Sequence, residues 1–171
     1  MGVARKVVGV VLSSLILIGV CVRIALFLFS TVDLGQTEKY VFQYINEERA
    51  NRNLPTLGND TELCRIAQNW SSYISSMNKL THGDFDGRMQ TIGLPNATYS
   101  CGEIIGSFSS GSINFIPTEN SPSDIARELV NGWLDSPPHR EIMLTASSGY
   151  MGVGVSKYGG VFYSVVDFKF A

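Results

Sequence analysis

The chain has 171 residues, of which 44% are hydrophobic and 16% are charged, and its formal net charge at pH 7 is -2. This length suits one domain with a small additional segment. The sequence has no run of basic residues and no basic stripe interleaved with aromatic residues, so it argues against nucleic acid as a partner.

An apolar stretch occupies residues 7–29, and Arg23 is its one charged residue. As a helix rising about 1.5 Å per residue, it would be roughly 34 Å long, enough to cross a hydrocarbon core about 30 Å thick. Arg23 lies near the outer end, where its side chain can reach the headgroups. A cleaved signal peptide is the alternative, but the stretch lacks a good cleavage site with small residues.

We therefore predict a signal-anchor or transmembrane segment over residues 1–30, a short linker over 31–37 and a domain over 38–171. Arg5 and Lys6 precede the apolar stretch, and this charge bias keeps the N-terminus inside the cell. The protein would be a single-pass membrane protein with its C-terminal domain outside the cytoplasm. It would be secreted if the N-terminal segment were cleaved.

The first two predicted elements of the domain are helices. Thr37 can cap a helix that ends near Asn51, with an apolar stripe formed by Tyr40, Val41, Tyr44 and Ile45. We expect the charged residues at its far end to face solvent, namely Glu47, Glu48 and Arg49. Asn59 or Asp60 can cap the second helix. Its predicted buried stripe is strongly amphipathic and consists of Leu63, Ile66, Ala67, Trp70, Ile74 and Met77.

The middle of the chain is less regular. Residues 82–93 predict a turn and a short helix, and residues 101–105 predict a short strand. Residues 106–123 are rich in glycine and serine, which is typical of a long surface loop. Ser121 or Ser123 can cap a third helix. Its predicted buried face consists of Ile125, Ala126, Leu129, Val130, Trp133 and Leu134.

A proline break follows this third helix, in the segment W-L-D-S-P-P-H-R-E-I-M-L of residues 133–144. Proline disfavours helix in the residue before it, so the chain turns there and His139 begins the next short element. Two β-rich runs, 150–156 and 161–170, flank a Gly-Gly pair and predict a hairpin. Helices followed by an antiparallel sheet, with one helix inserted, indicate an α+β fold.

Two kinds of covalent feature can be predicted for an extracytoplasmic domain. Cys64 and Cys101 are the only cysteines beyond the apolar stretch, and outside the cell such a pair suggests one disulfide. Two separate buried thiols are the alternative. The N-glycosylation pattern, which is common by chance, begins at Asn59, Asn69 and Asn96.

Five motifs in order resemble one family. They are residues 41–50 with L-P-T-L at 54–57; His82 with Phe85 and Arg88; Gly102-Glu103-Ile104; Trp133 with Ser136, His139 and Arg140; and Gly152-Val-Gly154. In this order and spacing the chain resembles the CAP superfamily of cysteine-rich secretory proteins, antigen 5 and pathogenesis-related 1. It is most similar to the prokaryotic SCP-like branch. The resemblance covers nearly all of residues 38–170.

The resemblance implies an α-β-α sandwich with a central antiparallel sheet. It also implies a cleft in which His82, Glu103 and His139 occupy the family's positions, and in which some members bind a divalent metal. Ser136 stands where the animal and plant branch has a glutamate. This departure leaves one carboxylate fewer for a metal.

Two imidazoles and a carboxylate suit zinc, so His82, His139 and Glu103 are candidate ligands of one divalent metal. The alternative is a polar network in which Glu103 is satisfied by a histidine and nearby backbone. Arg88 and Arg140 could bind an anionic ligand, or be exposed or paired with carboxylates. Ser136 beside His139 is a poor candidate nucleophile, because no G-x-S-x-G elbow is present.

We therefore expect a membrane-anchored, extracytoplasmic SCP-like domain that binds a lipid, a cell-envelope component or a protein in this cleft. An enzyme is the less favoured alternative, as a metal-dependent hydrolase using the same residues. The third alternative is a structural or adhesive surface domain without a ligand.

Overall fold

The structure is a computed structural model that describes residues 19–20, 32–109, 112–113, 116–117 and 121–171. The chain divides into two compact units, Met1–Val32 and Asp33–Ala171. The predicted anchor lies outside the described residues, apart from Gly19 and Val20. No helix within the described ranges is long and apolar enough to cross a membrane.

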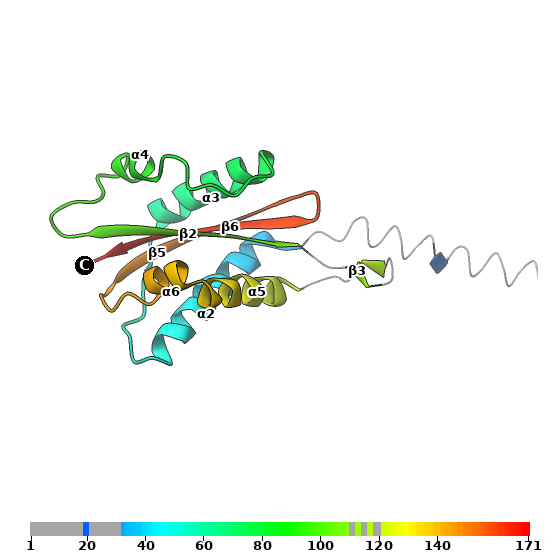
Figure 1. Cartoon of the computed structure of the whole chain (residues 1–171), viewed down its shortest axis with the longest axis horizontal. Helices are drawn as coiled ribbons and strands as arrows, with labels where there is room; N and C mark the ends of the chain where they lie inside the picture. Colours follow the sequence, from blue (N-terminus) through cyan, green and yellow to red (C-terminus); the bar gives the residue numbers. More distant parts are fainter. Residues whose placement is uncertain (1–18, 21–31, 110–111, 114–115, 118–120) are drawn as a thin grey trace, which may run out of the picture. The chain divides into compact units, whose positions relative to one another are not determined.

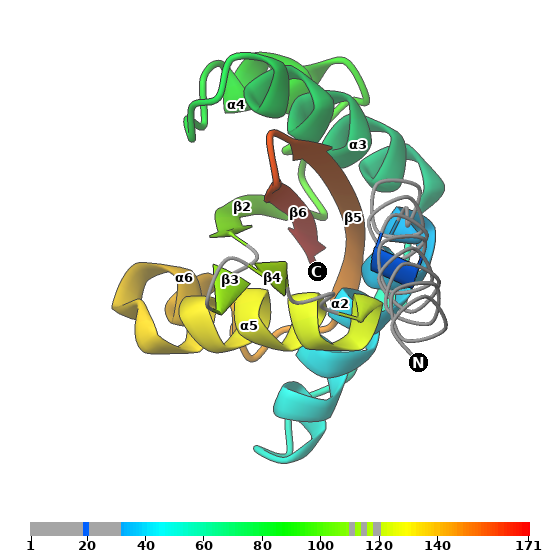
Figure 2. The same cartoon turned by 90° about the vertical axis from the view of Figure 1, so that its right-hand side faces the viewer.

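The second unit has three layers, with a sheet between two layers of helices (Figure 1, Figure 2). One face of the sheet is covered by α3 (Thr61–Ser76) and α4 (Phe85–Gln90). The other face is covered by α2 (Leu34–Ala50), α5 (Pro122–Asp135) and α6 (Pro137–Met143). The predicted α+β sandwich is thereby confirmed.

The sheet has the strand order β1 (Gly58–Asn59), β5 (Gly149–Tyr158), β6 (Val161–Phe170) and β2 (Ser100–Ser109). The three long strands are antiparallel, and β6 pairs with both neighbours along its whole length. The short β1 pairs with β5 in parallel, so the sheet is mixed rather than wholly antiparallel. Within the described residues, β2 forms one edge of the sheet.

The segment predicted as a loop, residues 106–123, contains more regular structure than expected. The strand β2 continues to Ser109, and two short antiparallel strands follow, β3 (Ser112–Ile113) and β4 (Ile116–Pro117). Ser121 caps α5 in a capping box with Asp124, as one of the two predicted caps. The predicted β5–β6 hairpin is confirmed, and it turns at Gly159 and Gly160, where φ is positive.

The helix α2 differs from its prediction at both ends. It begins at Leu34 rather than after Thr37, because the Asp33 side chain accepts the Gln36 N–H at 2.9 Å and caps the helix. At the other end, Arg49 does not face solvent but is completely buried. Arg49 follows Val41 and Ile45 at spacings of four, so it lies on the buried stripe.

The helix α3 lies directly against β5 because two glycines of that strand have no side chain. A Cβ on Gly152 would be 2.1 Å from the Cys64 nitrogen, and one on Gly154 would be 2.3 Å from the Gln68 nitrogen. Asp60 caps this helix, as predicted, and most of the predicted stripe is buried. Trp70 is half-buried, and Met77, which lies just beyond the last helical turn, is 40% exposed.

The predicted disulfide is wrong in this structure, because Cys64 and Cys101 are free thiols. Cys64 lies over Gly152 of β5, whereas Cys101 lies on β2, and β6 separates these two strands. Two strand spacings are about 9.6 Å, which is too far for a disulfide. The Cys64 thiol instead donates to Asn59 Oδ1 at 3.2 Å. Burial raises the pKa of both thiols.

Candidate functional site

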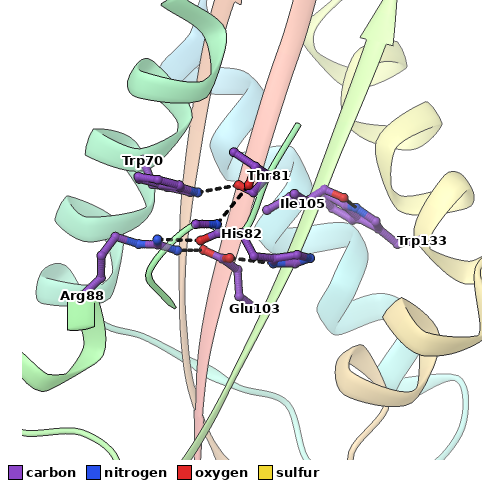
Figure 3. Close-up of polar contacts among 8 residues, drawn as sticks. Trp70, Thr81, His82, Arg88, Glu103, Ile105 and Trp133 are labelled. Atoms are coloured by element: carbon purple, nitrogen blue, oxygen red, sulfur yellow. Dashed lines mark hydrogen bonds and ion pairs between the residues drawn. The ribbon is translucent and has the colours of Figure 1, made fainter. Parts of the chain in front are cut away.

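The centre of the predicted site is Glu103, a buried carboxylate on β2 (Figure 3). Its Oε1 lies 2.7 Å from His82 Nδ1, and its Oε2 pairs with Arg88 Nη2. The Glu103 side chain is 2% exposed, whereas that of His82 is 51% exposed. The structure therefore brings three of the predicted site residues together, His82, Arg88 and Glu103, and leaves about half of the His82 side chain exposed to solvent.

Arg88 lies between this carboxylate and the α3 helix. Its guanidinium stacks over the Trp70 ring at 3.9 Å and donates to the His82 carbonyl at 2.7 Å. Trp70, which the sequence predicts as a core residue, is half-buried and donates from Nε1 to the Thr81 carbonyl at 2.9 Å (Figure 3). These bonds fix the 81–82 loop. Both Nη atoms of Arg88 are engaged, Nε is buried without a partner among the described residues, and the ion pair with Glu103 leaves little of the Arg88 charge for an anionic ligand.

A second buried carboxyl group, Asp167, was not identified from the sequence. It lies on β6 directly opposite Glu103, is completely buried, and has no hydrogen-bond partner of good geometry on either oxygen. Burial raises its pKa well above the usual range, the nearby Glu103 carboxylate raises it further, and Arg88 opposes both effects. A proton on Asp167 would allow it to donate to Glu103.

The position of Asp167 in the sequence is the feature that could have identified it. It stands as one acidic residue within the apolar run Val165–Phe168 of a strand predicted from its hydrophobicity. A carboxyl group at such a place needs either a partner or a proton.

His139 reaches the site from the other helical layer. It lies on α6, which follows α5 after a single extended residue, Ser136. The pKa of His139 is lowered, first by burial and then by the charge of His82, so the two imidazoles are close enough to interact. The segments that carry the two histidines both contact the edge strand β2: His82 bonds to Glu103 of this strand, and Ile142 of α6 packs against Gly102.

The remaining predicted site residues lie at the corner between α5 and α6. Ser136 is half-buried and occupies the N-cap position of α6, but its side chain makes no capping hydrogen bond. Arg140 is exposed and donates to the Leu134 carbonyl at 2.8 Å. It lines a surface depression together with Pro137, Glu141, Leu144 and Thr145. The corner itself is fixed to β2 by Trp133, whose Nε1 donates to the Ile105 carbonyl at 3.0 Å (Figure 3).

The arrangement does not fit a metal centre. Both oxygens of Glu103 already have partners, and the positive charge of Arg88 beside them disfavours a cation. Across the described ranges, no group of three or more His, Cys, Asp or Glu side chains could hold a metal ion. Two imidazoles alone fall short of the three protein ligands of a catalytic zinc.

Other predicted features lie away from the histidines. The three asparagines of the glycosylation pattern are all exposed, and their modification stays a prediction. A cavity of about 380 Å³ lies between α2, α3 and β5, lined by Gly35, Glu38, Lys39, Phe42, Asn59, Cys64 and Val153. Burial raises the pKa of Glu38 there, and its carboxylate accepts the Val155 N–H at 3.1 Å.

A family model matches most of the second unit. The family model of the CAP, or cysteine-rich secretory protein, family matches residues 42–168. No curated protein matches the chain at a significant level.

Solved structures share the fold. An outer surface protein of Borrelia burgdorferi has a TM-score of 0.61 at 24% identity, over 82% of this chain and 96% of that one. A cysteine-rich secretory protein of Staphylococcus aureus has a TM-score of 0.60 at 18% identity, over 83% of this chain and 41% of that one. An extracellular SCP-domain protein of Bacillus anthracis has a TM-score of 0.55 at 22% identity, over 79% of this chain and 40% of that one.

Proposed function

Because this chain belongs to the CAP family of cysteine-rich secretory proteins, of the type found in bacteria, we propose that it is an extracytoplasmic binding domain tethered to a membrane. Its ligand would be a component of the cell envelope, bound by the imidazoles of His82 and His139. The apolar stretch of residues 7–29 would form the tether.

One observation carries the binding role. Each oxygen of the buried Glu103 carboxylate has a partner, Oε1 in His82 and Oε2 in Arg88, so Glu103 serves to orient the site rather than to react. The bond to Nδ1 fixes the His82 ring and leaves Nε2 as the ring nitrogen without a hydrogen bond in the described part of the chain, on a side chain that is 51% exposed. A rigid polar group on a well-packed scaffold is suited to recognition, because little entropy is lost when a ligand binds.

The protonation of the site indicates the chemistry of the ligand. The lowered pKa of His139 keeps its ring neutral at pH 7, so it offers a hydrogen bond rather than a charge. A ligand rich in hydroxyl and amide groups, such as a glycan–peptide component of the envelope, meets such a surface better than an anion does. Lipids and proteins remain the competing ligand classes.

The test is a binding measurement on the full chain reconstituted in lipid nanodiscs. Isothermal calorimetry with a soluble peptidoglycan digest should give saturable binding, weakened at least about tenfold, or 1.4 kcal/mol, in His139→Ala and in His82→Ala. The matched control is Arg52→Ala, an exposed change near the end of α2 that should bind like wild type. Equal affinity of the wild type and both histidine variants would disprove the proposal.

The metal-dependent hydrolase is the second candidate, and a zinc titration of the same samples decides it. We expect no saturable zinc binding that depends on both histidines, because both oxygens of Glu103 are already paired with His82 and Arg88. Tight, histidine-dependent binding with turnover of peptides or esters would favour the hydrolase. A chain that binds none of the envelope, lipid or protein probes would favour the purely adhesive domain.

A further inference from the structure

Four large hydrophobic side chains are exposed in the second half of α3, the loop after it and the β5–β6 hairpin. Tyr73 is 51% exposed, Met77 40%, Leu80 42% and Tyr158 55%. Single exposed apolar residues are common on any soluble domain, so their number alone means little. Their common location is the informative feature.

Contacts of α3 and the loop after it with β5 and β6 place these residues at one end of the sheet. The hydroxyl of Ser71 lies 2.8 Å from that of Ser156, and the hydroxyl of Tyr163 pairs with Asn78. The last turn of α3 therefore ends beside the hairpin that carries Tyr158. Figure 2 looks directly onto this end of the domain, with α3 above the hairpin.

The domain joins the apolar N-terminal stretch at the same end. Glu38, in the second turn of α2, accepts the Val155 N–H at 3.1 Å, so α2 begins close to the hairpin. The apolar stretch ends at Phe29 and α2 is capped by Asp33. These two residues can be separated by at most about 14 Å of extended chain.

The two segments that carry the exposed residues contain basic but no acidic side chains. Residues 69–83 and 151–166 contain no acidic residue, and their lysines are Lys79 and Lys157. Two carboxylates lie at the start of α2: Asp33 caps the helix, and Glu38 accepts the Val155 N–H. Tyrosine and lysine are the residues that favour the interface between lipid headgroups and water, and lysine is attracted to anionic lipid.

We propose that this end of the domain rests on the bilayer surface, with Tyr73, Met77, Leu80 and Tyr158 in the headgroup region and Lys79 and Lys157 beside anionic lipids. The inference rests on the proposed tether, because the short connection from Phe29 to Asp33 is what holds this end near the membrane. It adds a fixed orientation, which a tether alone does not provide.

The orientation determines where the histidine site lies. Glu103 and Asp167 are in register with Gly152, and Gly152 is six residues from Tyr158 along β5. Six residues of strand span about 20 Å. The site of His82 and His139 would therefore face the space beyond the headgroups, where envelope components can reach it.

Quenching by brominated lipids tests the orientation in the full chain, reconstituted in vesicles of phosphatidylcholine and phosphatidylglycerol. Tyr158→Trp introduces a reporter at the proposed membrane-facing end, and Leu80→Trp introduces a second one. Tyr150→Trp is the matched control, since Tyr150 is 41% exposed on the same strand but eight residues, or about 26 Å, away. The wild-type signal of Trp70 and Trp133 is subtracted, and circular dichroism confirms that each variant folds.

We expect bromination near the headgroup to reduce the emission of the reporters at 158 and 80 at least about twofold, because they lie at the headgroup boundary, and to leave the reporter at 150 unchanged. A chain that floats with alkali-washed vesicles but shows no difference between the three reporters would overturn the orientation while keeping the tether. A chain that does not float would overturn the tether itself. Emission that changes with protein density, but not with bromine, would show that a second copy covers this end and would also overturn the inference.

Discussion

Two arginines support the two histidines of the site, and they do so by different chemistry. Arg88 pairs with the Glu103 side chain and donates to the His82 carbonyl, beside the half-exposed His82 ring. Arg49 is completely buried and donates only to backbone carbonyls, three of which belong to the segment that ends α6 and leads to β5. His82 is thus held beside a side-chain ion pair, whereas the helix of His139 is held through backbone carbonyls.

Removing Arg49 should give the largest loss of stability, because Arg49 holds the segment after α6 through its backbone carbonyls. Arg49→Met leaves the carbonyls of Pro55, Met143, Thr145 and Ser147 without their buried donor. We expect the free energy of unfolding to fall by at least about 3 kcal/mol, since each unpaired buried group costs about 1 kcal/mol or more. Urea unfolding of residues 33–171, a separate compact unit with its own core, measures it.

Arg52→Met is the control for this prediction, because Arg52 lies two residues beyond the end of the same helix but is exposed and pairs with Glu48. Its effect should stay within about 0.5 kcal/mol. If the two variants were equally stable, the carbonyl bonds of Arg49 would not be what holds the α6 segment.

Removing Arg88, which forms the ion pair beside His82, should give the next largest loss of stability. Arg88→Met leaves Glu103 and Asp167 together without a cation, so we expect a loss of about 2 kcal/mol in the free energy of unfolding. Adding Glu103→Gln to this variant should recover part of the loss, because the uncompensated charge is then removed. A double-mutant cycle without coupling between the two positions would contradict the ion pair.

The pH dependence of stability should reveal the proton on Asp167. Its pKa is raised in the folded state, so the folded protein holds a proton that the unfolded chain releases above its ordinary pKa of 3.8. Stability should therefore fall as the pH rises through the folded pKa. Asp167→Asn should remove this fall and gain on the order of 1 kcal/mol at neutral pH, because a neutral amide needs no proton in the folded state. Parallel stability curves for the two proteins would show that Asp167 does not titrate there.

The smallest expected effect concerns the contact between the two histidines. NMR titration of the His139 ring should give a pKa below 6.5, because burial and the charge of His82 both lower it. In His82→Gln the pKa of His139 should rise but stay below 6.5, since burial is the larger cause. An unchanged value would place the two rings too far apart to form one site.

The features that could be predicted from the sequence are those that depend on a short stretch of chain or on a known motif. The corner that presents His139 follows from Pro137 and Pro138, whose effect on the backbone is local, and the caps at Asp60 and Ser121 are equally local. The family motifs identified His82 and Glu103 as site residues. In each case either a short stretch of chain or a known pattern contains the necessary information.

The parts that could not be predicted depend on contacts between distant segments. Arg49 looks like an ordinary charged residue at a helix end until the 143–147 segment folds over it. Asp167 becomes a neighbour of Glu103 only through the register of β2 and β6. The disulfide was predicted from the number of cysteines, which says nothing about the strand that separates them.

The central position of β6 has a mechanical consequence. Strand β6 is paired on both sides, and it runs from the end where α2 begins to the opposite end, where Phe170 pairs with Gly149. A force applied between the start of α2 and Ala171 would pull β6 lengthwise against β5 and β2, so that many hydrogen bonds share the load at once. Such a domain should resist stretching better than one whose strands peel apart one bond at a time.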